Sequence, residues 1–95
     1  MKLQKNNSLT IPIRLIRKKN WGKGTMLDII KKNGKYKLRE GSMHPIQCWS
    51  DKKNKFRYQL YIPKMLSSVN NWKPGHEFSM GFDEDGAIEL DAGDQ

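Results

Sequence analysis

The chain has 95 residues and a net charge of +8, from 18 Lys and Arg against 10 Asp and Glu. Its hydrophobic content of 36% supports a thin core and is too low for a deep enzyme pocket. No apolar run approaches the roughly 18 residues of a membrane-spanning helix, and no apolar block follows the N-terminus as in a secretory signal. A single cysteine, Cys48, excludes an intrachain disulfide and fits a reducing compartment. We therefore expect a small, basic, soluble and cytoplasmic protein.

The positive charge is concentrated in the first half of the chain. Residues 1–40 hold 12 basic and two acidic side chains, whereas residues 41–95 hold six basic and eight acidic ones. Such a field attracts polyanions, nucleic acids above all. The alternative interpretation is a solvated face that keeps the protein soluble.

In the first half, turn residues separate short apolar segments. Asn33 followed by Gly34 is a type I′ hairpin signal. The predicted elements are a strand over 2–4, a turn at 6–7, a strand over 8–11, a helix over 13–20, a turn over 22–24, a strand over 26–30, the hairpin turn at 33–34 and a strand over 36–39. Residues 41–45 are the expected joint to the second half.

The second half follows the same order. The predicted elements are a strand over 46–49, a turn over 50–55, a strand over 56–62, a helix from Pro63 to about 70, a turn at 74–75, a strand over 77–82, a hairpin turn over 83–86 and a strand over 87–90. Alternation predicts one inward face on each long strand, formed by Phe56, Tyr58, Leu60 and Ile62, and by Phe78, Met80 and Phe82. Met65, Leu66 and Val69 have the spacing of a helix face.

The chain repeats itself at a shift of 51 residues. Seven of sixteen positions are identical between 9–24 and 60–75, where about one is expected from average composition. The identical pairs include Leu9 with Leu60, Pro12 with Pro63 and Trp21 with Trp72. The register slips by one residue at the later hairpin turns. We expect two units, 1–40 and 41–95, each too small to stand alone, that form one intertwined domain.

The repeated motifs resemble the AbrB/SpoVT (MraZ, MazE) swapped-hairpin family. The family pattern is an Ile-Pro pair opening a helix, a Pro-Gly-Asp/Glu-like turn and a strand hairpin around Asp-Gly. The matching runs are Leu9-Thr10-Ile11-Pro12, Leu60-Tyr61-Ile62-Pro63, Trp72-Lys73-Pro74-Gly75-His76-Glu77 and 83–90. Two departures stand out: His76 takes the usual acidic position, and Lys23 replaces the proline of the first turn.

The resemblance implies a mainly β fold with two short helices, a swapped-hairpin β-barrel built from two β-β-α-β-β repeats with pseudo-twofold symmetry. Family members mostly bind DNA, as transcription regulators or as antitoxins that also bind a toxin. Carried over by position, Arg17 falls on a basic helix site and Lys5 on the first hairpin turn. Ser67 and Ser68 take the helix positions of the second unit, where they depart from the pattern.

The DNA-contact candidates are basic residues on the first helix and on two hairpin turns. Lysines contact phosphates, and an arginine also reads a guanine edge. The candidates are Lys5, Arg14, Arg17, Lys18, Lys19, Lys52, Lys53 and Lys55. The alternative is an ordinary solvated helix side and a lysine-rich turn that aids solubility. The lysines 31, 32, 35 and 37 either extend this footprint or protect a hairpin from edge pairing.

Aromatic residues suggest a different nucleic-acid partner. Trp21 and Trp72 hold equivalent positions, so we expect both in the core. Trp49 and Tyr61 are candidates for stacking on unpaired bases in a single-strand or RNA binder, whereas Tyr58 faces inward.

No pattern supports catalysis, a cofactor or a metal. His44, His76 and Cys48 lack zinc-ligand spacing. The acidic cluster at 83–85 is too small for a calcium loop, and we expect a turn tip to be too exposed for acid–base chemistry. Ser67 and Ser68 are read as helix surface. The sequence therefore predicts a DNA-binding transcription regulator that is not an enzyme and acts as a homodimer or a self-contained monomer. The alternatives are an antitoxin or other protein-interaction module, whose acidic tail 91–95 faces a basic toxin-like partner, and an RNA or single-strand binder.

Overall fold

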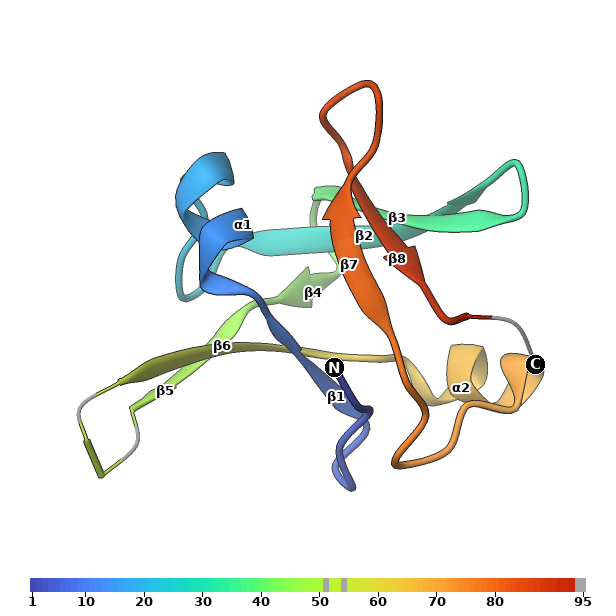
Figure 1. The fold of residues 1–95 in the computed structure, drawn as a ribbon, viewed down its shortest axis with the longest axis horizontal. Coiled ribbons are helices and arrows are strands. Elements are labelled where there is room, and N and C mark those ends of the chain that lie inside the picture. The colour runs from blue at the N-terminus through green and yellow to red at the C-terminus, as the bar shows by residue number, and fades with distance from the viewer. Residues whose placement is uncertain (51, 54, 94–95) are drawn as a thin grey trace.

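The fold, shown in Figure 1, is mainly β with two short helices. It was obtained as a computed structural model, which describes residues 1–50, 52–53 and 55–93. Within that part of the chain the elements are β1 (Ser8–Ile11), α1 (Ile13–Lys19), β2 (Met26–Lys32), β3 (Lys35–Glu40), β4 (His44–Pro45), β5 (Gln47–Ser50), β6 (Phe56–Tyr61), α2 (Lys64–Asn70), β7 (Ser79–Phe82) and β8 (Ile88–Asp91).

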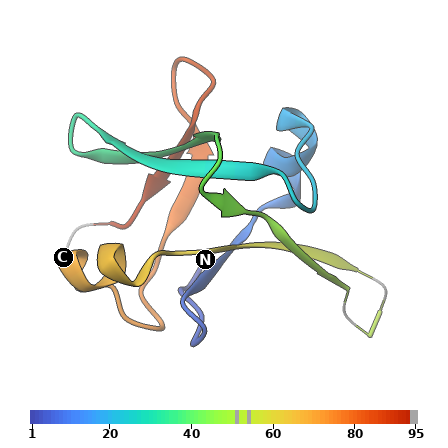
Figure 2. The same ribbon diagram turned by 180° about the vertical axis from the view of Figure 1, so that it is seen from behind.

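Two antiparallel sheets provide the core. The smaller sheet has the order β1-β6-β5 and the larger has the order β4-β2-β3-β8-β7. Leu9 and Leu60 of the smaller sheet and Leu27, Leu38 and Ile88 of the larger one are at most 1% exposed. The two helices lie at opposite sides of the molecule, as Figures 1 and 2 show from front and back.

The two halves repeat the same local structure around their helices. Pro12 and Pro63 precede α1 and α2, each with a φ of −56°. Each helix then ends at an asparagine in the left-handed region, which an asparagine adopts more readily than most residues. Trp21 and Trp72 follow these asparagines and are 7% and 6% exposed, so the prediction that both tryptophans lie in the core is confirmed.

The hairpin turns explain the one-residue slip in the repeat. Asn33 and Gly34 have φ values of 53° and 80°, as the predicted type I′ turn requires, and they join strands in a two-residue loop. In the second half the backbone N–H of Asp83 donates to the carbonyl of Ala87 at 2.8 Å, which leaves a three-residue loop. Gly86 takes the left-handed position in that loop, with a φ of 80°.

The segment that begins each half pairs with the turn that follows the helix of the other half. Leu3 exchanges backbone hydrogen bonds of 2.9 and 2.7 Å with residues 75–76. Ile46 exchanges two backbone hydrogen bonds of 2.9 Å with residues 24–25. Residues 24 and 75 are equivalent in the repeat, at a shift of 51 positions. The predicted strand at 2–4 is reduced to this contact and an isolated bridge, whereas β4 forms where only a joint was predicted.

Equivalent positions face each other across the sheets. Leu9 lies opposite Leu60 where β1 pairs with β6. Lys37 lies opposite Glu89 where β3 pairs with β8, and these positions also correspond once the one-residue slip is counted. Equivalent positions of the two halves therefore pair with each other in both sheets.

The joint between the halves is fixed by Asp28. Its carboxylate accepts hydrogen bonds from the backbone N–H groups of Ser42 at 3.0 Å and Met43 at 3.1 Å. A Cβ at Gly41 would lie 2.1 Å from Cγ of Asp28, so a larger residue there would displace this carboxylate from its hydrogen bonds.

Several predicted inward faces are wrong. Phe56 is 64% exposed because β1 covers β6 only from Tyr58 onward, and Tyr58 itself is half-buried. Phe82 is 41% exposed at the end of β7, although Phe78 and Met80 are buried as predicted.

The predicted face of the second helix is also wrong. Met65 and Val69 are each 77% exposed, whereas Ser67, predicted as surface, is 8% exposed. The hydroxyl of Ser67 donates to Oδ1 of Asn7 at 3.1 Å, so α2 packs a serine rather than a valine against the first half.

Candidate nucleic-acid interface

Helix α1 presents basic side chains to solvent above two buried residues. Leu15 and Ile16 are at most 3% exposed and anchor the helix. Arg17 and Lys18 are exposed and Lys19 is half-buried. All three stand in the last turn, where positive charge interacts favourably with the helix dipole.

A projecting hairpin carries the second group of candidates. We call residues 47–57 the arm; it extends at the lower left of Figure 1. In the first half, Leu3 and Leu9 are six positions apart. The equivalent residues of the second half, Ile46 and Leu60, are fourteen positions apart, so the arm makes this hairpin eight residues longer. Its described basic residues are Lys52, Lys53, Lys55 and Arg57, all exposed.

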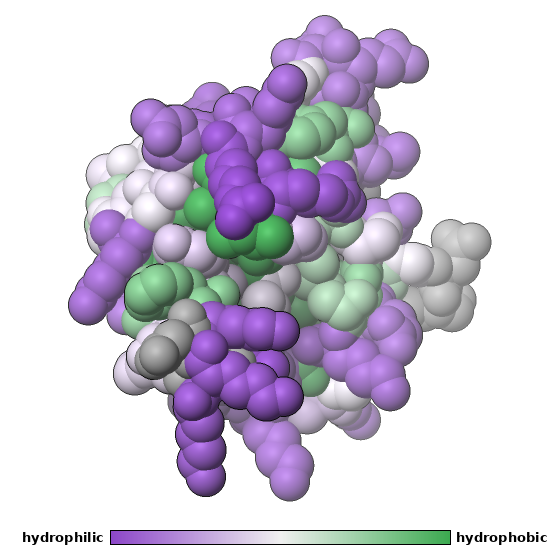
Figure 3. All heavy atoms as spheres, turned by 60° about the vertical axis from the view of Figure 1, so that its left-hand side comes forward, coloured by the Kyte–Doolittle hydropathy of each residue, from purple (hydrophilic) through white to green (hydrophobic). Residues whose placement is uncertain are grey.

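A groove of about 630 Å³ separates α1 from the arm. Arg17 lies on its helix side and Lys55 on its arm side. Two exposed apolar side chains also line it, Ile13 at 44% and Phe56 at 64%. Figure 3 brings this side forward and shows hydrophilic side chains around a smaller hydrophobic area. The structure thus joins candidates that are 38 residues apart in the sequence.

Other predicted contacts lie away from this groove. The turn that carries Lys5 is attached to the opposite end of β1, where the side-chain amide of Asn7 donates to the carbonyl of Ile62 at 2.7 Å. Arg14 donates from Nη2 to the carbonyl of Met80 at 3.3 Å, so it leans against β7.

The lysine-rich turn of the first half does not extend the footprint. Figures 1 and 2 place the tip of the β2–β3 hairpin at the opposite side of the molecule from α1. The basic side chains of the first half therefore do not form one continuous surface.

The groove is also lined by two residues that were not predicted as contacts from the sequence. Ile13 and Phe56 were assigned no binding role, and Phe56 was placed in the core. The unequal spacing between repeated positions was the available signal, because it shows that the second hairpin is longer than its counterpart and that Phe56 lies past the end of β1.

The aromatic candidates for base stacking share a different surface. Trp49, 53% exposed, lies opposite Arg57 in the β5–β6 ladder. Tyr61, 38% exposed, lies four residues further along β6 and therefore on the same face. Tyr58 lies on the other face and packs against the core.

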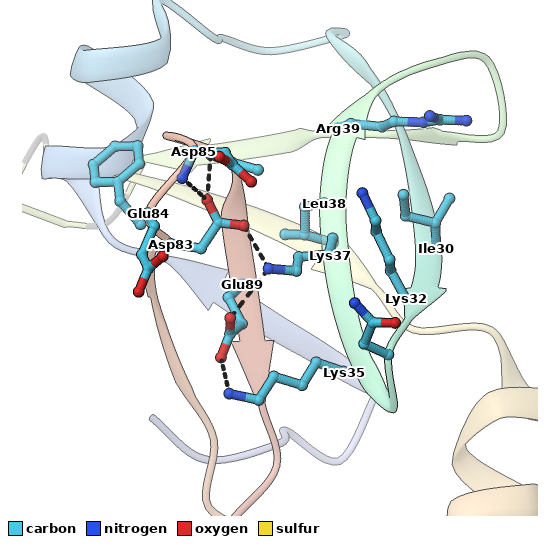
Figure 4. Close-up of a pocket in the computed structure, with 13 residues that line it drawn as sticks. Ile30, Lys32, Lys35, Lys37, Leu38, Arg39, Asp83, Glu84, Asp85 and Glu89 are labelled. Atoms are coloured by element: carbon cyan, nitrogen blue, oxygen red, sulfur yellow. Dashed lines mark hydrogen bonds and ion pairs between the residues drawn. The ribbon is translucent and has the colours of Figure 1, made fainter.

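A second hollow, shown in Figure 4, lies between the β2–β3 and β7–β8 hairpins. Nζ of Lys37 donates to Asp83 and, at 3.2 Å, to Oε2 of Glu89, while Lys35 lies 3.2 Å from the other Glu89 oxygen. Glu84 and Asp85 are exposed as expected of a turn tip, whereas the Asp83 side chain is only 13% exposed.

Hydrogen bonding to Lys37 dominates the titration of this cluster. It lowers the pKa of Asp83 and the pKa of Glu89 below their ordinary values. The hydrogen bond to Asp83 in turn raises the pKa of Lys37. Both carboxylates are thus held ionised by lysines, which suits an ion-pair link between the halves rather than proton transfer.

The remaining candidates for chemistry are scattered. Among residues 1–50, 52–53 and 55–93, no group of three or more His, Cys, Asp or Glu is placed to hold a metal ion. Nε2 of His76 lies 2.7 Å from the carbonyl of Ala92, and Cys48 is a half-buried free thiol. No helix in that same part of the chain has the length and apolarity to cross a membrane.

Comparison with known proteins found no matching family model, no matching curated protein and no matching solved structure.

Proposed function

We propose that this protein is a non-enzymatic, duplex DNA-binding transcription regulator that contacts DNA with α1 and the arm. The observation that carries the proposal is the groove in which Arg17 and Lys55 line opposite sides. Two cationic walls around a shallow channel are suited to a sugar-phosphate backbone.

The arrangement of charges gives each part a distinct role. Lysines of the arm supply phosphate contacts that hold the protein in register, and Arg17 has the fork geometry to read a guanine edge. Asp83 and Glu89 are paired with lysines elsewhere in the molecule, so these two acids do not oppose the phosphates at the groove.

The resemblance to the AbrB/SpoVT family supports the same function. The reciprocal pairing of Leu3 with residues 75–76 and of Ile46 with residues 24–25 is the pattern a swapped-hairpin barrel would have. We propose that the chain forms such a barrel from its own two halves.

The proposal is tested by fluorescence anisotropy with labelled duplex DNA. With about six phosphates neutralised, affinity falls roughly a thousandfold between 50 and 200 mM salt. The Arg17→Ala/Lys18→Ala variant binds roughly tenfold more weakly and shows a salt slope smaller by about two.

A matched control removes the same charge beside α2. Lys64→Ala/Lys73→Ala changes two exposed lysines at the start of α2 and in the turn that follows it. We expect an affinity within about twofold of the parent protein, since these lysines lie away from the groove. Equal losses in the two variants, or binding without salt dependence, would refute the proposed surface.

Single-strand or RNA binding is a second candidate, favoured by the shared face of Trp49, Arg57 and Tyr61. Competition of unlabelled duplex, single-stranded DNA and RNA for the same protein separates the two functions. Preference for a single strand, lost in Trp49→Ala but kept in Arg17→Ala/Lys18→Ala, would favour this second function.

A further inference from the structure

The two halves differ most at two places, and both places line the same groove. In α1 the exposed residues Arg17 and Lys18 correspond to Ser68 and Val69 in α2. The arm is present only in the second half, where it adds eight residues and four basic side chains. One of these features thus belongs to the first half and the other to the second.

The exchange between halves explains how these two changes meet. The short first-half turn packs against the second helix, since Asn7 accepts the hydrogen bond of Ser67. By the same relation the second half's hairpin lies beside the first helix, where Lys55 and Phe56 line the groove with Arg17. If each half kept its own hairpin beside its own helix, the basic residues of α1 and the long arm would lie on opposite sides of the molecule.

The opposite face has neither feature. There the short turn meets α2, whose exposed side chains include Met65 and Val69, each 77% exposed. The correspondence of the two halves in the sheets is therefore not followed by the surface. The α1 site carries Arg17 and Lys18 and is flanked by the long arm, whereas the α2 site has Ser68 and Val69 at the equivalent positions and only the short turn beside it.

Resting on the proposed DNA binding, we infer that one chain recognises one non-palindromic DNA site through the groove between α1 and the arm. Symmetric dimers read inverted repeats because each subunit presents an identical contact surface. Within residues 1–50, 52–53 and 55–93 this chain presents a single such surface, with α1 on one side of the bound backbone and the arm on the other. The DNA sequence it selects has no internal twofold symmetry.

The test begins with selection of preferred sites from a randomised duplex library by the full chain. The complex with the selected duplex is then measured by sedimentation and native mass spectrometry. We expect a non-palindromic site occupied by one chain. Lys53→Ala/Lys55→Ala and Arg17→Ala/Lys18→Ala each weaken binding roughly tenfold and lower the salt slope by about two. The Lys64→Ala/Lys73→Ala control stays within about twofold.

The possible outcomes separate the inference from the function on which it rests. Failure to bind any duplex, with circular dichroism showing folded protein, overturns the proposed function itself. Salt-dependent binding of two chains to an inverted repeat overturns the inference alone. Loss of affinity in the α1 variant, with none in the arm variant, also overturns it, because α1 would then act without the second half.

Discussion

Lys37 links the two halves through two carboxylates. Its side chain is 16% exposed, those of Asp83 and Glu89 are 13% and 22% exposed, and all three meet between β3 and the β7–β8 hairpin. Protonation of either acid, or deprotonation of the lysine, removes the ionic hydrogen bond. The stability of the protein is therefore coupled to pH at both ends of the scale.

Lys37→Met should lower the melting temperature most between about pH 5 and pH 10. Because the pKa values of Asp83 and Glu89 are lowered, these groups add stability at pH values above their ordinary pKa values of 3.8 and 4.5. This stability is lost as the pH falls through the lowered pKa values. The raised lysine pKa adds stability that is present below 10.5 and lost as the pH rises through the raised value.

Calorimetry of the parent and variant across this range checks the prediction. The two melting temperatures should converge as the pH falls through the lowered carboxyl pKa values and as it rises through the raised pKa of Lys37. Lys73→Met is the control, with an exposed lysine outside this cluster. A gap that stays constant at every pH would show that Lys37 stabilises the fold by packing alone.

At the scale of elements, each helix depends on one residue in the left-handed region. Asn20 has φ and ψ of 58° and 38°, and Asn71 has 57° and 36°. The tryptophan that follows donates its backbone N–H to the helix, to Ile16 at 2.9 Å in α1 and to Ser67 at 2.8 Å in α2. This closure directs each tryptophan into the core.

Asn20→Ala and Asn71→Ala should each reduce the free energy of unfolding by about 1 kcal/mol, because alanine pays a steric cost in this region. Asn→Gly at the same positions should be nearly neutral, since glycine adopts the conformation freely. Urea denaturation measures both. An alanine variant as stable as the parent would mean that the helix end has rearranged.

The sequence predicted the elements that depend on local signals. The proline before each helix and the Asn33 and Gly34 turn work through their own backbone angles, so they could be placed without tertiary information. The face of α2 could not, because a seven-residue helix offers too few turns for periodicity to distinguish Val69 from Ser67. Partners from the other half decided which was buried.

The basic residues of the candidate site were predictable from the sequence, but its apolar lining and its assembly were not. Arg17 and Lys55 were nominated from charge and position, and Lys5 was nominated on the same grounds. Only the exchange between halves determines that Lys55 lies beside α1 while the turn of Lys5 lies beside α2. Such long-range pairing leaves little trace in local composition.

At the scale of the whole molecule, the two halves share one core. Leu9 and Leu60 are completely buried and lie opposite each other, one from each half. The halves also carry opposite charges where β3 meets β8, so two first halves would place Lys37 against Lys37. The core and the charges together favour one chain folding upon itself.

Leu60→Ala should therefore destabilise both halves equally, by about 2–5 kcal/mol. Trp21 reports on the first half when Trp49 and Trp72 are replaced by Phe, and Trp72 reports on the second when Trp21 and Trp49 are replaced. Fluorescence-detected denaturation should give the same loss of stability with either reporter. If Trp21 kept its original transition, the halves would be independent units.

The exchange also sets when folding can be completed. Leu3 bonds to residues 75–76 and Lys2 bridges to Glu77, so residues 2–3 cannot reach these native partners until residues 75–77 have been made. Until then, the apolar residues of the first half lack the partners that the second half contributes to the shared core. Completion of the shared core must therefore follow synthesis of residues 75–77, and long-range pairing of this kind is slow to form.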